Sequence, residues 1–99
     1  MKHFVVEISY TVDFEKIKEV LDEHRSFLQI GYDKNMLLCS GPQEPLTGGI
    51  AIAKAESLED IVEFFENDPY NKAGYTEYLY TEFNPVKFQD FMGNWVSEN

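Results

Sequence analysis

The sequence predicts one α+β domain with elements in the order β-α-β-β-α-β. Three observations lead to this class: alternating apolar residues near both ends of the chain, a long apolar stripe at helical spacing, and a second helix preceded by a capping signal. The chain has 99 residues, which suits a single domain because typical domains hold roughly 100–150 residues. Its 43% of hydrophobic and 15% of aromatic residues are enough to build a core.

The first strand and the first helix occupy roughly the first third of the chain. Residues 3–10 alternate, with Phe4, Val6, Ile8 and Tyr10 on one side, which indicates a strand. Asp13 is the predicted N-cap of the helix that follows. Gly31 or Asn35 is predicted to end it. The helical stripe consists of Phe14, Ile17, Leu21, His24, Leu28 and Gly31, widened by Val20, Phe27 and Ile30.

The remaining elements complete the pattern. Residues 36–40 and 50–55 are short apolar runs bounded by Gly and Pro and are predicted strands. Residues 57–60 have the spacing of an N-terminal capping box, so a second helix follows. Pro69 interrupts this helix, because proline disfavours a helical conformation in the residue before it. A last strand spans residues 75–83, and the whole corresponds to a ferredoxin-like antiparallel sheet with helices on one face.

The other face of this sheet also carries apolar residues. In the last strand, Tyr78 and Tyr80 point opposite to Leu79 and Phe83. Two helices can cover only one face, and an exposed apolar face of this size needs a cover, by a partner subunit or a ligand. We therefore expect a homodimer whose sheets face each other.

The C-terminal segment adds a second amphipathic feature. We expect a domain over residues 1–88 and an amphipathic extension over residues 89–99. This segment either lies over a subunit boundary or the open edge of the domain, or packs on its own subunit. Its apolar residues at helical spacing are Phe88, Phe91, Met92, Trp95 and Val96.

Charge and composition exclude several kinds of partner. Eight Lys and Arg stand against eighteen Asp and Glu, for a net charge of −10. The absence of a cationic cluster disfavours nucleic acid and anionic membranes as partners. Without a signal peptide or an apolar run of about 20 residues, the expected location is cytoplasmic. The lone Cys39 is expected to be an inert core residue.

No metal or cofactor is expected from the motifs. His3 and His24 lie on different elements, and neither HExxH nor CxxC is present. GxGxxG and GxxxxGK[ST] are absent too, so no nucleotide cradle is indicated. His3, at a strand start, is expected to be a solvated surface residue.

The predicted catalytic residues are His24 and Asp68. An imidazole with a pKa near ~6.5 can give or take a proton at cellular pH, and a carboxylate can hold it in one tautomer. Both predicted helices lie on the same face of the sheet, so the two side chains can meet. Structural alternatives stay open: His24 as a hydrogen-bonded core residue, and Asp68 as a cap.

Four further residues are predicted to bind a small molecule next to this pair. A phenol can donate a hydrogen bond into the site, although packing is the alternative for any tyrosine. A strand end with glycine lets a ligand approach the backbone closely, or is merely a turn. These predicted binding residues are Tyr70, Ser40, Gly41 and Pro42.

Several short motifs occur in a fixed order along nearly the whole domain: His24 in mid-helix, the run 36–42 ending in Gly-Pro, Gly48-Gly49, the run 55–59, and Asn67-Asp68-Pro69-Tyr70 followed by Ala73-Gly74. This ordered set resembles the YCII-related (YciI-like) family. The resemblance implies a dimeric α/β barrel of the ferredoxin-like type. It further implies that His24 and Asp68 act together in an active site. Similar proteins include lyase- or isomerase-type enzymes that act on small ring compounds without a metal.

The chain departs from the family pattern near the predicted base. Leu21 replaces an arginine that is common three residues before the histidine, which removes an anion anchor. Arg25 is expected to point elsewhere on the helix. Residues 89–99 extend past the usual end.

The functional hypothesis is a cofactor-independent small-molecule enzyme of the lyase or isomerase type. His24 would transfer the proton, and Asp68 would orient the His24 imidazole. The alternative is a non-catalytic small-molecule-binding or protein-interaction module. In a third interpretation, the protein is a dimer in which His24 is only a hydrogen-bonded residue of the core.

Overall fold

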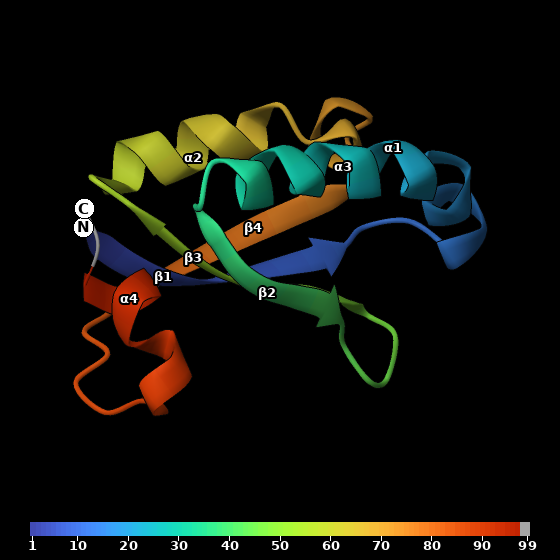
Figure 1. Ribbon diagram of the computed structural model, residues 1–99. Helices are drawn as coiled ribbons and strands as arrows, with labels where there is room; N and C mark the ends of the chain where they lie inside the picture. Colours follow the sequence, from blue (N-terminus) through green and yellow to red (C-terminus); the bar gives the residue numbers. More distant parts are fainter. Residues whose placement is uncertain (98–99) are drawn as a thin grey trace.

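A four-stranded antiparallel sheet forms the centre of the computed structural model, which describes residues 1–97. The strands are β1 (Lys2–Tyr10), β2 (Leu37–Pro42), β3 (Gly48–Ala55) and β4 (Thr76–Phe83). Their spatial order is β2-β3-β1-β4, so the first and third strands are central (Figure 1). The predicted α+β class and the ferredoxin-like order of elements are confirmed.

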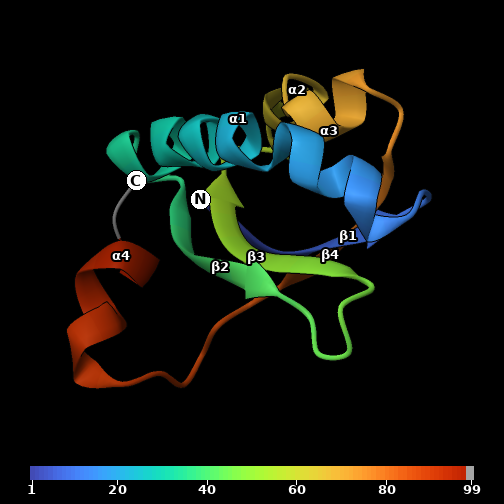
Figure 2. The ribbon, with the colours of Figure 1, turned by 90° about the vertical axis from the view of Figure 1, so that its right-hand side faces the viewer.

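Three helices cover one face of the sheet, as both ribbon views show (Figures 1 and 2). They are α1 (Phe14–Asp33), α2 (Leu58–Glu66) and α3 (Pro69–Lys72). The short η1 (Asp90–Met92) and α4 (Gly93–Ser97) lie on the opposite side of the sheet. No helix within residues 1–97 is long and apolar enough to cross a bilayer.

The core lies between the helices and the inward face of the sheet. Val6 pairs with Ala51 on one side and Tyr80 on the other, and paired residues share a face. The alanines of β3, Ala51, Ala53 and Ala55, share one buried cluster with the helix residues Phe27 and Phe65. The buried core cluster contains Phe4, Val6, Ile8, Phe27, Leu37, Ala51, Ala53, Ala55, Ile61 and Phe65.

The helix ends agree only in part with the prediction. Ser57 caps α2 by accepting the Asp60 N–H at 3.1 Å, as its spacing predicted. Asp13 is the N-cap residue of α1, as predicted, but its side chain makes no capping hydrogen bond. Gly31 does not end α1 either: it is buried inside the helix, where a Cβ would lie 2.7 Å from Leu37 Cδ1. Asn35, with a φ of 62°, takes the left-handed conformation just after the helix.

The C-terminal segment packs on its own subunit and buries His3. The His3 Nε2–H donates to the Val96 carbonyl over 3.1 Å, and the Lys54 ammonium donates to the Trp95 carbonyl over 2.6 Å. His3 is therefore buried, and the expectation of a solvated residue is wrong. Burial lowers the pKa of His3 from its ordinary 6.5. The last two residues of the expected extension, 98 and 99, lie outside the described residues.

Cys39 is exposed, contrary to the expected core position. The pairing of β2 with β3 shifts register between Leu37 and Cys39, and Cys39 then pairs with Ile52. Since Leu37 is the one buried residue of β2, this edge strand contributes little to the core. An apolar run predicts a strand but does not tell which of its residues are covered.

We predict that Gly48→Ala strongly destabilises the fold. A Cβ at Gly48 would lie 1.9 Å from the Ile8 carbonyl oxygen, and backbone cannot move aside as a side-chain tip can. Overpacking of this kind costs about 1–3 kcal/mol. The matched control is Gly41→Ala, where a Cβ meets no atom within 4 Å. Urea unfolding should separate the two variants, and equal free energies of unfolding would contradict this account of β3.

Candidate functional site

Asp68 sits in the tight connection between α2 and α3. Pro69 follows it as the first residue of α3, a position where the missing N–H of proline is not needed. Asp68 has extended backbone geometry, as expected before proline, and its Oδ1 accepts the Tyr70 N–H at 3.0 Å. The Asp-Pro-Tyr sequence thus builds a local cap that fixes the carboxylate in place.

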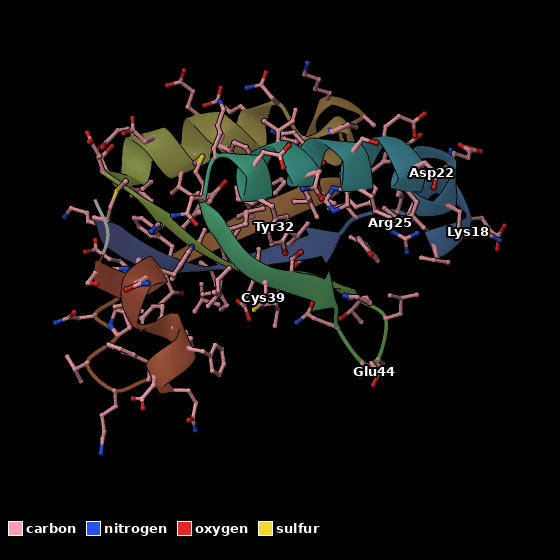
Figure 3. The ribbon with its side chains drawn as sticks, viewed as in Figure 1. Lys18, Asp22, Arg25, Tyr32, Cys39 and Glu44 are labelled. Atoms are coloured by element: carbon pink, nitrogen blue, oxygen red, sulfur yellow. The ribbon has the colours of Figure 1, made fainter. Side chains whose placement is uncertain are left out.

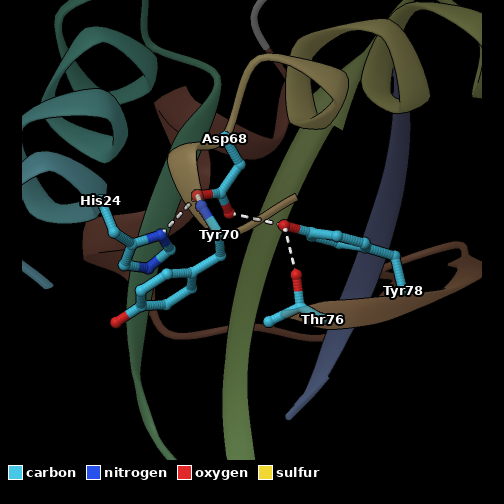
Figure 4. A network of polar contacts seen from close by, with 5 residues as sticks. All are labelled: His24, Asp68, Tyr70, Thr76 and Tyr78. Atoms are coloured by element: carbon cyan, nitrogen blue, oxygen red, sulfur yellow. Dashed lines mark hydrogen bonds and ion pairs between the residues drawn. The ribbon is translucent and has the colours of Figure 1, made fainter. Parts of the chain in front are cut away.

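Three donors from three segments converge on this carboxylate, which is 0% exposed (Figure 4). Besides the Tyr70 N–H, His24 Nδ1 lies 2.8 Å from Oδ1, and the Tyr78 hydroxyl donates to Oδ2 over 2.7 Å. An ionised carboxylate only accepts hydrogen bonds, and three donors satisfy it. Nδ1 must then carry the proton in this contact. The neutral His24 ring therefore keeps its lone pair on Nε2.

The imidazole is fixed on its face as well as at Nδ1. It stacks on the Tyr70 ring with centroids 3.8 Å apart and planes 9° from parallel. His24 is only 8% exposed. Its Nε2 is nevertheless not among the buried polar atoms, and it makes no hydrogen bond with any residue in 1–97. This nitrogen is free to meet a molecule in the adjoining cavity.

The phenols around Asp68 are held in their protonated form. Burial, and then the Asp68 charge, raise the pKa of Tyr78 far above its ordinary 10. The same two causes, with a smaller effect of Glu66, raise the pKa of Tyr80 to about 12. Burial also raises the pKa of Tyr70, with contributions from Tyr10 and Asp68. At physiological pH these hydroxyls are hydrogen-bond donors and not phenolates.

A cavity of about 420 Å³ adjoins the His24 ring, within the ~300–1,000 Å³ range of small-molecule pockets. One stripe of α1, at spacings of three and four, forms a wall: Leu21, His24, Arg25 and Leu28. Its other walls are mostly apolar and come from the sheet, the 42–49 connection, Phe14 and Tyr70. Within residues 1–97 no three His, Cys, Asp or Glu side chains are grouped so as to hold a metal ion.

The predicted site residues come together around this cavity. His24, Tyr70, Ser40, Gly41 and Pro42 all line it, whereas the Asp68 carboxylate lies behind the imidazole. The Ser40 hydroxyl is also within 2.6 Å of the Tyr32 hydroxyl, so it is already engaged.

Two residues of the site were missed or misplaced. Arg25 was expected to point away, but it lines the cavity (Figure 3). Its spacing with Leu21 and Leu28 could have revealed this, because the three form one helical stripe. The bond of Tyr78 to Asp68 joins residues brought together only by the fold, and no sequence signal marks it.

These features define a class: a ferredoxin-like domain with a buried His–Asp pair beside a cavity for a small molecule. A model of the YCII-related domain matches residues 1–84. The chain belongs to this family, which confirms the resemblance noted in its motifs.

A solved structure shares the fold. It is 5-chloro-2-hydroxyhydroquinone dehydrochlorinase (TftG) from Burkholderia phenoliruptrix AC1100, in complex with 2,5-dihydroxybenzoquinone. It is 22% identical, with a TM-score of 0.71, over 82% of this chain and 92% of that one. No curated protein matches the chain.

We predict that Tyr78→Phe destabilises the protein and that Tyr80→Phe does not. The two rings lie on the same face of β4 with centroids 6.3 Å apart, but only Tyr78 donates to Asp68. A hydrogen bond to a charged group is worth about 1.5–3 kcal/mol, so Tyr78→Phe should lose that amount in urea unfolding. Tyr80→Phe should stay within about 0.5 kcal/mol of the wild type. Equal losses would mean that the Tyr78 hydroxyl does not stabilise the carboxylate.

Proposed function

We propose that this protein is a cofactor-independent small-molecule enzyme of the lyase or isomerase type, with His24 as its proton-transferring base. The observation that carries the proposal is the 2.8 Å contact between His24 Nδ1 and a fully buried Asp68, beside a cavity. A histidine that merely satisfied the core would have no reason to keep its second nitrogen accessible.

The proposed chemistry needs only side chains. His24 Nε2 removes a proton from a molecule in the cavity, and the imidazolium that forms lies against the Asp68 carboxylate. The proton then returns to another atom of the substrate, or leaves with a departing group. A positioned general base contributes typically ~10²–10⁴-fold to the rate.

The cavity favours a small ring compound as substrate. Its walls are largely apolar, and the open backbone at Gly41 has no neighbour within 4 Å of a Cβ position. Ser40, Gly41, Pro42 and Tyr70 would contact the substrate. The TftG complex supports this choice, because that protein is a dehydrochlorinase and holds a six-membered ring compound.

The first test uses the chlorinated compound in the name of TftG. Purified protein is incubated anaerobically with 5-chloro-2-hydroxyhydroquinone, and chloride release is measured. We expect release above the buffer blank and a loss of roughly 10²–10⁴-fold in His24→Gln. The matched control is His3→Gln, which removes the chain's other histidine from the opposite face of the sheet and should keep the activity.

Two outcomes would contradict the enzyme proposal. Chloride release that is unchanged in His24→Gln would exclude this residue as the base. Tight binding of the compound with no turnover would instead favour the alternative, a non-catalytic small-molecule-binding module.

A homodimer through the open sheet face belongs to the same proposal. The C-terminal segment covers the His3 and Lys54 end of that face, but Leu79 stays 58% exposed, and Ile50 and Phe83 are exposed with it. Ile50 lies on β3 and Leu79 and Phe83 lie on β4, on either side of β1, and they share one face because Leu79 and Ile50 both pair with Glu7. A second copy would cover them.

We predict a dimer in sedimentation at micromolar concentration and its dissociation in Leu79→Lys. A charge buried in an apolar interface is costly, so the substitution should shift the equilibrium to monomer. The control is Ile30→Lys, at a residue 49% exposed on the solvent side of α1. A wild-type monomer, or equal behaviour of the two variants, would overturn the dimer.

A further inference from the structure

We infer that the Tyr70 hydroxyl and the Arg25 guanidinium form a binding subsite for a negatively charged oxygen, next to the base. The substrate class is then a small cyclic carbonyl compound whose oxygen takes up charge as an enolate when a proton is removed. This inference deepens the proposed function and rests on it.

The Tyr70 hydroxyl is the first of two observations. Tyr70 is 2% exposed, and its hydroxyl is a buried polar atom with no hydrogen-bond partner in residues 1–97. The Tyr10 phenol is close enough to raise the pKa of Tyr70, but the two hydroxyls do not meet hydrogen-bond geometry. An unsatisfied buried donor costs roughly 1–3 kcal/mol. A ligand oxygen in the adjoining cavity would satisfy it.

Arg25 is the second observation. Its side chain lines the same cavity and forms no ion pair or hydrogen bond with a described residue. Its charge reaches the Tyr70 hydroxyl, since it opposes the rise in the pKa of that phenol. A guanidinium without a carboxylate partner is a strong donor for an anionic oxygen.

The charge of the cavity contrasts with that of the chain. The protein carries a net charge of −10, yet no Asp or Glu of the described residues lines this cavity. Arg25 is the one permanently charged side chain among its walls, and Asp68 is screened behind His24. The local field therefore favours an anion in a protein that otherwise repels anions.

The relation of these groups to His24 gives the subsite its chemical role. The Tyr70 ring stacks on the imidazole, so its hydroxyl and the free Nε2 belong to one wall. When Nε2 takes a proton from the carbon beside a carbonyl, the C–H electron pair forms a carbon–carbon double bond, and the π pair of the carbonyl moves to its oxygen. Tyr70 and Arg25 would stabilise that oxyanion. Expulsion of a leaving group from the carbon next to the deprotonated one gives a lyase reaction, and reprotonation of a conjugated enolate at its far carbon gives an isomerase reaction.

Binding of two planar probes tests the subsite without any turnover. The probes are 2,5-dihydroxybenzoquinone, an anion at pH 7 because its hydroxyls are vinylogous acids, and neutral hydroquinone. Calorimetry should show that Arg25→Gln lowers the affinity for the anion by roughly tenfold or more and changes the affinity for hydroquinone by less than about twofold. Tyr70→Phe should lower the affinity for the anion by roughly three- to tenfold. Its melting temperature should not fall, because the hydroxyl it removes has no partner.

The matched control is Lys18→Gln, which removes the same charge from the same helix. Lys18 pairs with Glu15 at 3.9 Å and does not line the cavity (Figure 3). It should leave both affinities within about twofold of the wild type. If Lys18→Gln and Arg25→Gln lower the affinity for the anion equally, the effect is one of net charge and the subsite is contradicted. The subsite is also contradicted if the wild type does not bind the anion.

The two proposals fail separately. If chloride release depends on His24 but the affinity for the anion does not depend on Arg25 and Tyr70, His24 is supported as the base and the subsite is contradicted. If the anion binds through Arg25 and Tyr70 without any turnover, the enzyme proposal falls and the anion subsite stands.

Discussion

The buried carboxylate of Asp68 is the constraint on which the site and the adjoining packing depend. It accepts hydrogen bonds from an imidazole on α1, a backbone N–H of α3 and a phenol on β4. A charge without solvent contact persists only where its oxygens are satisfied, and removing one partner of a buried pair costs about 3–5 kcal/mol. The same bonds tie the helical layer to the sheet and fix the tautomer of His24. The Asp68 carboxylate therefore serves both the packing of the fold and the chemistry of the site.

The inward surface of helix α1 has two stripes of residues, which contact different parts of the protein. One stripe, with Ile17, Phe27 and Gly31 buried, faces the core. The neighbouring stripe, with Leu21, Arg25 and Leu28, faces the cavity. His24 lies where the two stripes meet, so its Nδ1 can reach a buried carboxylate while its Nε2 stays accessible. This position suits a base that must be both fixed and reachable.

Periodicity and local capping predicted most of the fold, because they depend on residues near each other in sequence. The strands, the Ser57 cap and the break at Pro69 are of this kind. The contact of Tyr78 with Asp68 and the burial of His3 under the C-terminal segment depend on tertiary packing, which no local pattern contains. The apolar pattern of α1 does not mark Arg25, because a charged residue on the cavity wall looks in sequence like a solvent-exposed one. The pairing of His24 with Asp68 was anticipated because both helices were placed on one face and the family motifs join them.

The most direct test of this account is the nitrogen-15 NMR spectrum of the His24 side chain, with the His3 signals assigned by His3→Gln. For the neutral ring we predict one tautomer, with the proton on Nδ1 held by Asp68 and a lone pair on Nε2. A neutral ring with its proton on Nε2, or a rapidly exchanging mixture of tautomers, would contradict the central claim that Asp68 prepares His24 as a base.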